Sequence, residues 1–339
     1  MSRVPALGPA ASDAGVPPET PILGLPTIRR TALAARRAGF ASVAVEDSSL
    51  PVVAALVGTE AEVGMPAPAG AVAMEWNRAV TVKDLEAVLA GAPPSSVGVL
   101  VATPADRARA EDHLLAALVK DTEGFMSRHV ERKISLAVSR RLAATRVTPN
   151  AMTLFSVAIG LAGAAFFLVP TARMETIGAL LFLLHSILDG CDGELARLKF
   201  QESRSGGVLD FWGDNVVHVA VFSAMALGWH RAAGGPAPLL LGALAVGGTL
   251  ASALLVYART MAPREAEGPL YTSVATGETT RLSRVADALS RRDFIYLVLI
   301  LSAFGKAGWF LVLTAVGAPV YFLVLTAIAL AERRPRSAS

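Results

Sequence analysis

The sequence contains a single cysteine, Cys191, so no disulfide can form within the chain. Charged residues are also scarce: they make up 17% of the 339 residues, against 53% for hydrophobic residues, and the mean hydropathy is +0.51. This composition excludes an ordinary soluble protein, and the chain is too long for one small domain. The net charge is only +3, with basic residues beside apolar runs. That pattern favours a membrane surface and argues against a nucleic-acid partner.

The apolar residues are concentrated after residue 150, in six segments that each approach the length a bilayer core demands. We place these segments at 151–169, 176–197, 206–229, 239–260, 293–306 and 308–331. We therefore expect residues 151–335 to form an all-α, six-helix integral membrane domain. On one side of this predicted bundle the connections contain only Arg173, Arg231 and Lys306, whereas the other side is rich in Lys and Arg. The positive-inside rule then predicts that both termini and the region around residues 189–214 are cytoplasmic.

The sequence before these segments predicts three parts. Residues 1–20 are rich in Pro, Ala and Gly and predict a disordered tail. Residues 21–120 alternate helix-like and strand-like stretches, which predicts a small soluble α/β domain with a parallel sheet. The predicted helices are 26–39, 82–91 and 105–120, and the predicted strands are 40–46, 69–75 and 97–103.

Residues 121–150 predict a basic, amphipathic connector beside the membrane. Val130, Ile134, Ala137 and Val138 share one helical face, and arginines and a lysine cover the rest. Such a helix can lie flat in the headgroup region. The alternative is a solvated helix that belongs to the soluble domain.

Four aspartates lie in the stretch LDGCDGELARLKFQESRSGGVLDFWGD, residues 188–214, between two apolar segments. An ionised side chain in the hydrocarbon core costs roughly 2.5–3.5 kcal/mol, so these acids need a water-filled ion path or a bound metal. Asp189 and Asp192 lie at i and i+3, and Asp210 and Asp214 at i and i+4, so each pair shares a helix face. Two divalent cations would neutralise four carboxylates, and hard oxygen ligands favour Mg²⁺, Mn²⁺ or Ca²⁺ over zinc.

Small residues accompany the aspartates. A glycine inside a helix costs about 1 kcal/mol relative to alanine, which suggests that something bulky approaches the backbone at Gly193. Ala196 follows Asp192 by one turn, and Arg197 could hold a phosphate with its forked donors. Gly206 would let two helices cross closely, and simple helix packing is the alternative for each glycine.

Every fixed position of the motif D-x2-D-G-x2-A-R-x8-G-x3-D-x3-D is present here. The motif resembles the signature of the CDP-alcohol phosphotransferase (CDP-alcohol phosphatidyltransferase) family, and the resemblance covers roughly residues 125–335. It implies a six-helix membrane enzyme, usually a homodimer, that moves a substituted phosphoryl group from a CDP-alcohol donor lipid to a polar or phosphorylated alcohol and releases CMP. It also implies two divalent ions, Mg²⁺ or Mn²⁺.

The resemblance implies roles for the matching positions. Asp189, Asp192 and Asp210 would bind metal, and Asp214 would bind the second metal or act as base toward the acceptor hydroxyl. Asp210 and Asp214 would thus be the catalytic pair. The site for the cytidine diphosphate would be lined by Asp189, Gly193, Ala196 and Arg197.

The stretch ILGLPTIRRTALAARRAGFASVAV is similar to the helix and strand after the active loop of sugar-type nucleotidyltransferases. Members of the family exist in which a cytidylyltransferase precedes the membrane domain. Here the place of the glycine-rich loop has the sequence LGPAASDAGVPPE, so we expect a degenerate, inactive domain with a scaffold or regulatory role. An unrelated α/β domain is the alternative.

The sequence does not identify the acceptor or fix the roles of some residues near the motif. Candidates for binding an acceptor phosphate are Arg132, Lys133, Arg259, Arg291 and Arg292, although anchoring to the membrane is the commoner role of such residues. Asn215 stands where many relatives carry Lys or Arg. His185 and His218 could tune the site or simply be packed histidines, and Cys191 is expected to be a small helix residue.

Three functions compete at this stage. The first is a transferase that makes a phospholipid or, alternatively, a soluble product of the di-inositol-phosphate type. The second is a transporter with an acidic ion path, which the lack of a second interrupted helix argues against. The third is a catalytically silent membrane scaffold.

Overall fold

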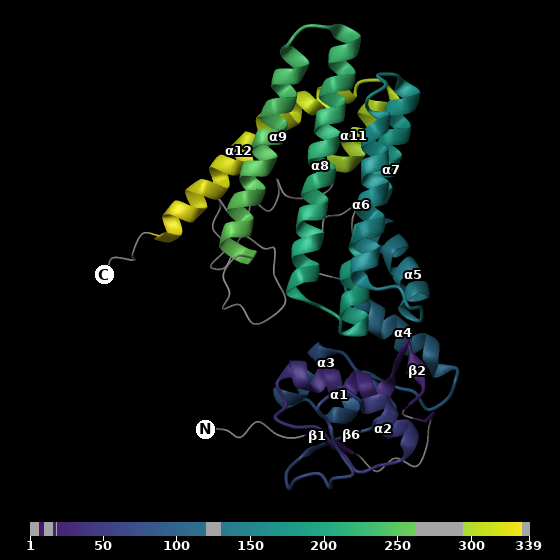
Figure 1. Ribbon diagram of the computed structural model, residues 1–339. Helices are drawn as coiled ribbons and strands as arrows, with labels where there is room; N and C mark the ends of the chain where they lie inside the picture. The colour runs from purple at the N-terminus through teal and green to yellow at the C-terminus, as the bar shows by residue number, and fades with distance from the viewer. Residues whose placement is uncertain (1–6, 10–15, 18, 120–129, 262–293, 334–339) are drawn as a thin grey trace. The chain divides into compact units, whose positions relative to one another are not determined.

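The computed structural model describes residues 7–9, 16–17, 19–119, 130–261 and 294–333 (Figure 1). It divides the chain into two compact units. The N-terminal unit consists of Met1–Asp121, Leu136–Arg146 and Glu194–Gln201. The helical unit consists of Thr122–Ser135, Val147–Gly193 and Glu202–Ser339. The division differs from the predicted domains, because residues 136–146 and 194–201 group with the N-terminal unit.

The N-terminal unit contains helices at each place where the sequence predicts one. They are α1 (Thr27–Ala38), α2 (Leu50–Leu56), α3 (Val82–Leu89), α4 (Asp106–Ala116) and a short 3-10 turn, η1 (Pro94–Ser96). Gly39 ends α1 in the left-handed conformation that glycine adopts without steric cost. Thr81 and Asp84 form a capping box at the start of α3, in which each side chain accepts the backbone N–H of the other.

The strands of this unit are much shorter than predicted. They are β1 (Leu7–Pro9), β2 (Pro21–Ile22), β3 (Leu25–Pro26), β4 (Ala44–Val45), β5 (Glu62–Val63), β6 (Val72–Met74), β7 (Arg78–Ala79) and β8 (Val99–Leu100). Among the described residues they form four two-stranded sheets: β1–β6 and β4–β5 are parallel, and β2–β3 and β7–β8 are antiparallel. The prediction of one parallel sheet therefore does not hold, because pairing depends on partners that alternation along the chain does not specify.

Residues 7–9 also differ from the predicted disordered tail, since β1 pairs with β6. The core of the N-terminal unit is made of small and medium apolar side chains from α1, α2, α3 and the strands. Fully buried members include Ile28, Val43, Val45 and Leu85. The α/β character is thus present, although a nucleotidyltransferase fold does not follow from these short paired strands.

The helical unit follows the predicted segments closely. Its helices are α6 (Pro149–Phe166), α7 (Ala172–Lys199), α8 (Arg204–Ala233), α9 (Ala237–Val256), a π-helical turn η3 (Tyr257–Met261), α11 (Phe294–Ala303) and α12 (Ala307–Arg333). Thr148 caps α6 by accepting the Ala151 N–H, and Pro149 occupies the first helical position, where its missing N–H costs nothing. Ser203 caps α8 in the same way by accepting the N–H of Gly206 at 3.0 Å.

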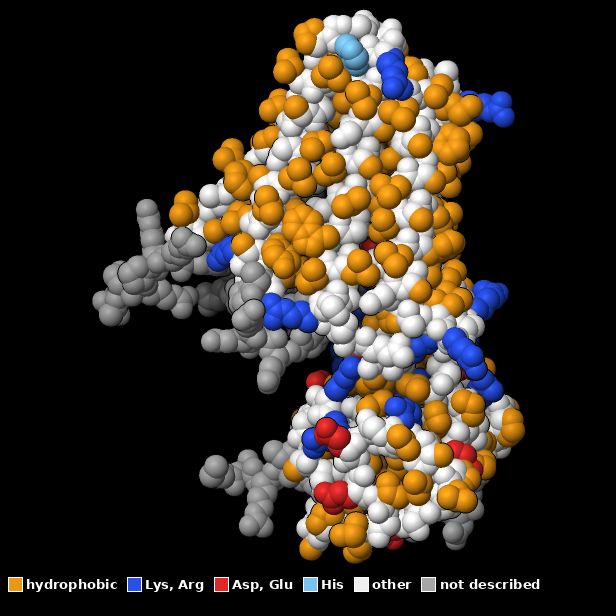
Figure 2. Space-filling model, in the orientation of Figure 1, with side chains coloured by type: hydrophobic (Ala, Val, Ile, Leu, Met, Phe, Trp, Pro, Cys, Tyr) orange, Lys and Arg blue, Asp and Glu red, His pale blue; other side chains and the backbone are white. Residues whose placement is uncertain are grey.

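Four helices in the described part of the chain are long and apolar enough to cross a membrane. They are Pro149–Phe166, Ala172–Lys199, Ala237–Met261 and Ala307–Ala331, while α11 is a shorter apolar helix. Apolar side chains cover the visible face of the helical unit (Figure 2). Leu240, Leu254 and Leu323, for example, are each more than half exposed. A surface of this kind is suited to contact with lipid tails rather than water.

Helix α5 (Arg132–Ala143) inverts the arrangement of a helix in a soluble protein. Its buried side is formed by Glu131, Ser135 and Ser139, whereas Val130 and Ile134 are 40% and 44% exposed. An interfacial helix needs outward apolar side chains beside basic residues, so the exposure of Val130 and Ile134 is compatible with the connector, which stays a prediction. Residues 121–129 of the predicted connector lie outside the described residues.

Candidate active site

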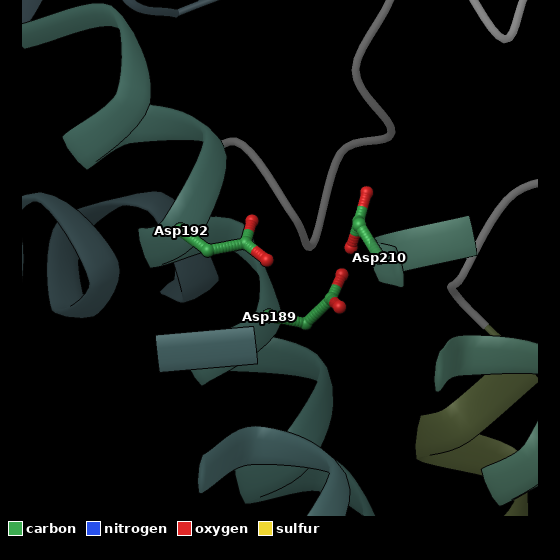
Figure 3. A group of neighbouring side chains, drawn as sticks. All are labelled: Asp189, Asp192 and Asp210. Carbon is green, nitrogen blue, oxygen red and sulfur yellow. The ribbon is translucent and has the colours of Figure 1, made fainter. Parts of the chain in front are cut away.

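Three of the four aspartates meet in the helical unit. One carboxylate oxygen from each of Asp189, Asp192 and Asp210 can be chosen so that all three lie within 4.8 Å of one another. Figure 3 shows Asp189 and Asp192 on α7 and Asp210 on α8 directed into one space. Asp189 and Asp192 are only 4% and 6% exposed. The i, i+3 spacing therefore places Asp189 and Asp192 on one face of α7, as the sequence predicts.

The start of α6 supports this group from the side. The buried hydroxyl of Thr153 donates a hydrogen bond to Oδ2 of Asp192, which fixes that carboxylate on the inner face of α7. A Cβ added at Gly206 would come within 3.0 Å of Asn150 Oδ1, and one added at Gly213 would lie 2.7 Å from a methyl group of Val157. Glycines on α8 thus allow the close approach to α6. Thr153 and Gly213 were not predicted, because nothing local distinguishes them from packing residues.

The electrostatics of the group favour a cation. Two ionised carboxylates whose oxygens lie within 4.8 Å repel each other by about 3 kcal/mol or more at an effective dielectric constant of about 20. Burial adds to this cost, because few waters can solvate Asp189 and Asp192. Three hard carboxylate ligands fit Mg²⁺, Mn²⁺ or Ca²⁺. The three carboxylates are therefore suitable ligands for the metals that the sequence predicts.

Asp214 is not one of the three carboxylates that converge. Its Oδ1 lies 3.4 Å from Nε2 of His185, a residue that is only 2% exposed. The other ring nitrogen of His185, Nδ1, lies 3.0 Å from the carbonyl oxygen of Ser156 on α6. The ring is therefore held between α6 and Asp214. Sequence reasoning considered His185 only as a tuning or packing residue, since its partner lies on another helix.

The remaining predicted neighbours occupy ordinary places. His218 Nδ1 lies 2.9 Å from the Asp214 carbonyl, one turn back on its own helix, and Asn215 donates to the Phe211 carbonyl at 2.8 Å. The buried thiol of Cys191 faces the Ser135 carbonyl at 3.6 Å, as expected for a small packing residue. Arg132 and Lys133 lie on α5, Arg259 lies in η3, and Arg291 and Arg292 lie outside the described residues.

The positions predicted to line the cytidine diphosphate follow along α7. Gly193 closes the α7 segment of the helical unit, whereas Ala196 and Arg197 belong to the part of α7 that groups with the N-terminal unit. All three are half-buried. Their role in binding a donor stays a prediction.

Comparison with known proteins finds a family whose model matches part of the chain. The family model for CDP-alcohol phosphatidyltransferase matches residues 146–282. This part of the chain is therefore similar to CDP-alcohol phosphatidyltransferases. The matched range contains α6 through η3, and with them all four aspartates of the motif.

Several curated proteins resemble part of this chain. A protein of Archaeoglobus fulgidus named bifunctional IPC transferase and DIPP synthase is 40% identical over 136 residues, covering 39% of this chain and 26% of the relative. A protein of the same name from Rubrobacter xylanophilus is 37% identical over 165 residues, covering 48% of this chain and 36% of the relative. A phosphatidylinositol phosphate synthase of Mycobacteroides abscessus is 33% identical over 110 residues, covering 31% and 49%.

The chain thus spans between 26% and 36% of the length of the bifunctional relatives that it matches. Among solved structures, that of Mycobacterium tuberculosis phosphatidylinositol phosphate synthase with CDP-DAG bound aligns with a TM-score of 0.41 at 20% identity, covering 61% of this chain and 98% of that chain.

Proposed function

We propose that this protein is a membrane-embedded transferase that moves a substituted phosphoryl group from a CDP-alcohol donor, such as CDP-diacylglycerol, to a polar alcohol with release of CMP. The meeting of Asp189, Asp192 and Asp210 inside the range that matches the CDP-alcohol phosphatidyltransferase family model carries this proposal. We also propose a membrane location with six spanning helices, cytoplasmic termini and a cytoplasmic site. The four apolar helices support the membrane location, and the distribution of basic residues supports the orientation. Membrane lipids and a second copy of the chain are the proposed partners.

The residues of the site have different proposed roles in the reaction. Asp189, Asp192 and Asp210 would hold the divalent ions, Mg²⁺ or Mn²⁺, and Thr153 keeps Asp192 oriented. When bound, two such ions would neutralise the pyrophosphate of the donor and stabilise the departing CMP. Asp189, Gly193, Ala196 and Arg197 would bind the cytidine diphosphate, with the guanidinium of Arg197 on a phosphate.

Asp214 is the proposed base. Its carboxylate is not one of the three that converge, and as a base it would accept the proton of the acceptor hydroxyl. The buried ring of His185, 3.4 Å away, restricts the positions that this carboxylate can adopt. The predicted alternative for Asp214, a ligand of the second metal, remains open for the same reaction.

A soluble product is the second candidate. Four of the relatives are named bifunctional IPC transferase and DIPP synthase, which favours a product of the di-inositol-phosphate type. Other relatives are named phosphatidylinositol phosphate synthase and CDP-diacylglycerol–serine O-phosphatidyltransferase, which favours a lipid product. Both products would arise from the same chemistry at the same carboxylates.

CMP release by the purified protein in mild detergent tests the proposal. CDP-diacylglycerol and CDP-inositol are offered with Mg²⁺ or Mn²⁺ against inositol phosphate, inositol, glycerol phosphate and serine. We expect release that requires one acceptor, disappears with a chelator, and falls by about a hundredfold or more in Asp210→Asn, since that change removes a charged ligand.

Asp47→Asn is the matched control, because Asp47 is an exposed aspartate of the N-terminal unit. It should release CMP at the wild-type rate. Release that persists undiminished in Asp210→Asn would exclude the proposed site. A wild-type protein that releases no CMP from any pair of substrates would favour the catalytically silent scaffold.

A further inference from the structure

Helix α7 ends in a turn that its own sequence does not favour. Phe200, directly after the helix, has φ +55, a left-handed conformation that usually requires glycine because of its steric cost to a side chain. The Phe200 N–H donates to the Arg197 carbonyl at 3.4 Å, and the Gln201 N–H donates to the Ala196 carbonyl at 2.8 Å. These are the paired bonds of a Schellman motif. A bulky residue in this turn must be held by its surroundings.

Arg30 of α1 provides one part of that support. The Schellman bonds use the carbonyls of Ala196 and Arg197, and the next one, Leu198 O, accepts a hydrogen bond from Nη1 of Arg30 at 3.0 Å. Nη2 of Arg30 donates to Ile22 O at 3.1 Å. Arg30 is only 2% exposed. A buried guanidinium is costly unless it is hydrogen-bonded, and a cation at a helix C-terminus interacts favourably with the helix dipole.

The side chains of the turn provide the other part. The Phe200 ring packs against the apolar core of the N-terminal unit, and the Arg37 guanidinium lies 4.7 Å from the centroid of that ring. Such a cation–π contact adds to the burial of the ring. Lys199 Nζ donates to the Thr145 carbonyl at 2.9 Å. The Leu198 carbonyl, the Phe200 ring and the Lys199 amino group thus all contact residues of the N-terminal unit.

From these contacts we infer that the N-terminal unit clamps the last turn of α7, with Arg30 and Phe200 as positioning residues for Arg197. The inference rests on the proposed function, in which Arg197 binds the diphosphate of the donor. The unit then contributes to donor binding through a helix end and needs no nucleotidyl transfer of its own. A helix end that frays would let the Arg197 side chain sample many orientations, which lowers affinity for a nucleotide diphosphate.

Arg30→Met in the full-length protein tests the clamp, with Arg36→Met as control. Arg36 lies on the same helix but is exposed and pairs with Glu60 at 2.8 Å. Two quantities are measured with Mn²⁺ present: amide hydrogen exchange of residues 194–201 and the affinity for CDP by calorimetry. For Arg30→Met we expect exchange about tenfold faster in that segment and CDP affinity about tenfold weaker, the effect of losing one hydrogen bond to a charged group.

The same experiment separates positioning from general destabilisation. In Arg30→Met, exchange of α3 and affinity for Mn²⁺ alone should stay within about twofold of wild type, and Arg36→Met should change none of the four measurements. Phe200→Ala is the second variant, because Phe200 is only half-buried and the change removes no hydrogen-bonding group. It should also accelerate exchange at 194–201 and weaken CDP binding.

Other outcomes would overturn the inference or the function separately. Unchanged exchange at 194–201 in both variants, or CDP affinity equal to wild type despite faster exchange, would overturn the clamp. Wild-type protein that does not bind CDP would overturn the role of Arg197. Wild-type protein that binds CDP but releases no CMP would overturn the proposed function while the exchange and affinity measurements still decide the clamp.

Discussion

The two units differ in what their acidic side chains meet. In the N-terminal unit each of three acids faces a base: Asp84 lies 2.7 Å from His113, and Glu111 and Asp112 lie 2.9 and 2.8 Å from Arg140. In the helical unit the acids of the motif face one another, with oxygens of Asp189, Asp192 and Asp210 within 4.8 Å.

This difference distinguishes acids that stabilise the fold from acids that can bind a ligand. An acid that is paired with a base or caps a helix contributes modestly to stability, by about 1 kcal/mol or less at a partly exposed position. Buried acids that face each other destabilise the fold unless a cation joins them, so a sequence keeps them only for what they bind. The comparison therefore supports the proposal that the chemistry belongs to the helical unit, while the paired acids of the N-terminal unit support its fold.

The largest expected effects come from removing one charge from each unit, which tests whether the two kinds of acid differ in role. Asp189→Asn should lower CMP release by about a hundredfold or more, because it removes a metal ligand. In the presence of a chelator it should unfold at an equal or higher temperature than wild type, since like-charge repulsion is relieved. Asp84→Asn should do the opposite: CMP release within about twofold of wild type, and a loss of about 0.5–1 kcal/mol of stability in the N-terminal unit.

Rates of CMP release and thermal unfolding with and without Mn²⁺ check both variants. A chelator-treated Asp189→Asn protein that unfolds well below wild type would mean that Asp189 is a structural residue. An Asp84→Asn protein that loses transfer while remaining folded would place chemistry in the N-terminal unit.

Two glycines provide a test of how tightly the N-terminal unit is packed. A Cβ at Gly24, which has φ +79, would collide with the Ala143 carbonyl, whereas one at Gly39, with φ +100, would meet nothing within 4 Å. Gly24→Ala should therefore destabilise the unit by about 2–4 kcal/mol, from backbone strain plus overpacking. Gly39→Ala should cost only about 1 kcal/mol, the strain alone. Amide exchange of α1 measures both, and equal losses would show that the approach of Gly24 to α5 is loose.

The smallest expected effect is the pH dependence of the Asp84–His113 pair. The hydrogen bond to Asp84 raises the pKa of His113 above its ordinary value of 6.5, although partial burial opposes this. Burial alone would raise the pKa of Asp84, but hydrogen bonds from His113 and Thr81 outweigh it and hold that pKa below 3.8.

The two shifts define a window of stability. The raised pKa of His113 adds stability that is complete below about pH 6.5 and is lost as pH rises through the pKa of the folded state. The lowered pKa of Asp84 adds stability that is complete above about pH 4 and is lost as pH falls through its folded-state pKa. Exchange of α4 in wild type and His113→Gln should therefore differ more at pH 5.5 than at pH 8.5 (both values chosen on either side of the ordinary pKa of His113). A difference that grows with pH would contradict the pairing.

The sequence by itself determined the positions of the helices and the chemistry of the motif. Thr148 and Pro149 start α6, Ser203 starts α8, and the spacing of Asp189 and Asp192 places both acids on one face of α7. These features depend on neighbours within a turn or two of the same helix, and a helical period is a local property of the chain. For the same reason the family could be predicted from one stretch of residues.

Only the tertiary structure decided which groups meet across helices. It brought Asp210 to the α7 pair and left Asp214 beside His185, it turned the polar side of α5 inward, and it paired short strands that alternation along the chain had suggested as one sheet. It also placed Arg30 on the end of α7, a contact between residues 168 positions apart. Such contacts depend on how elements rotate and pack against one another, which no spacing within a single helix or strand specifies.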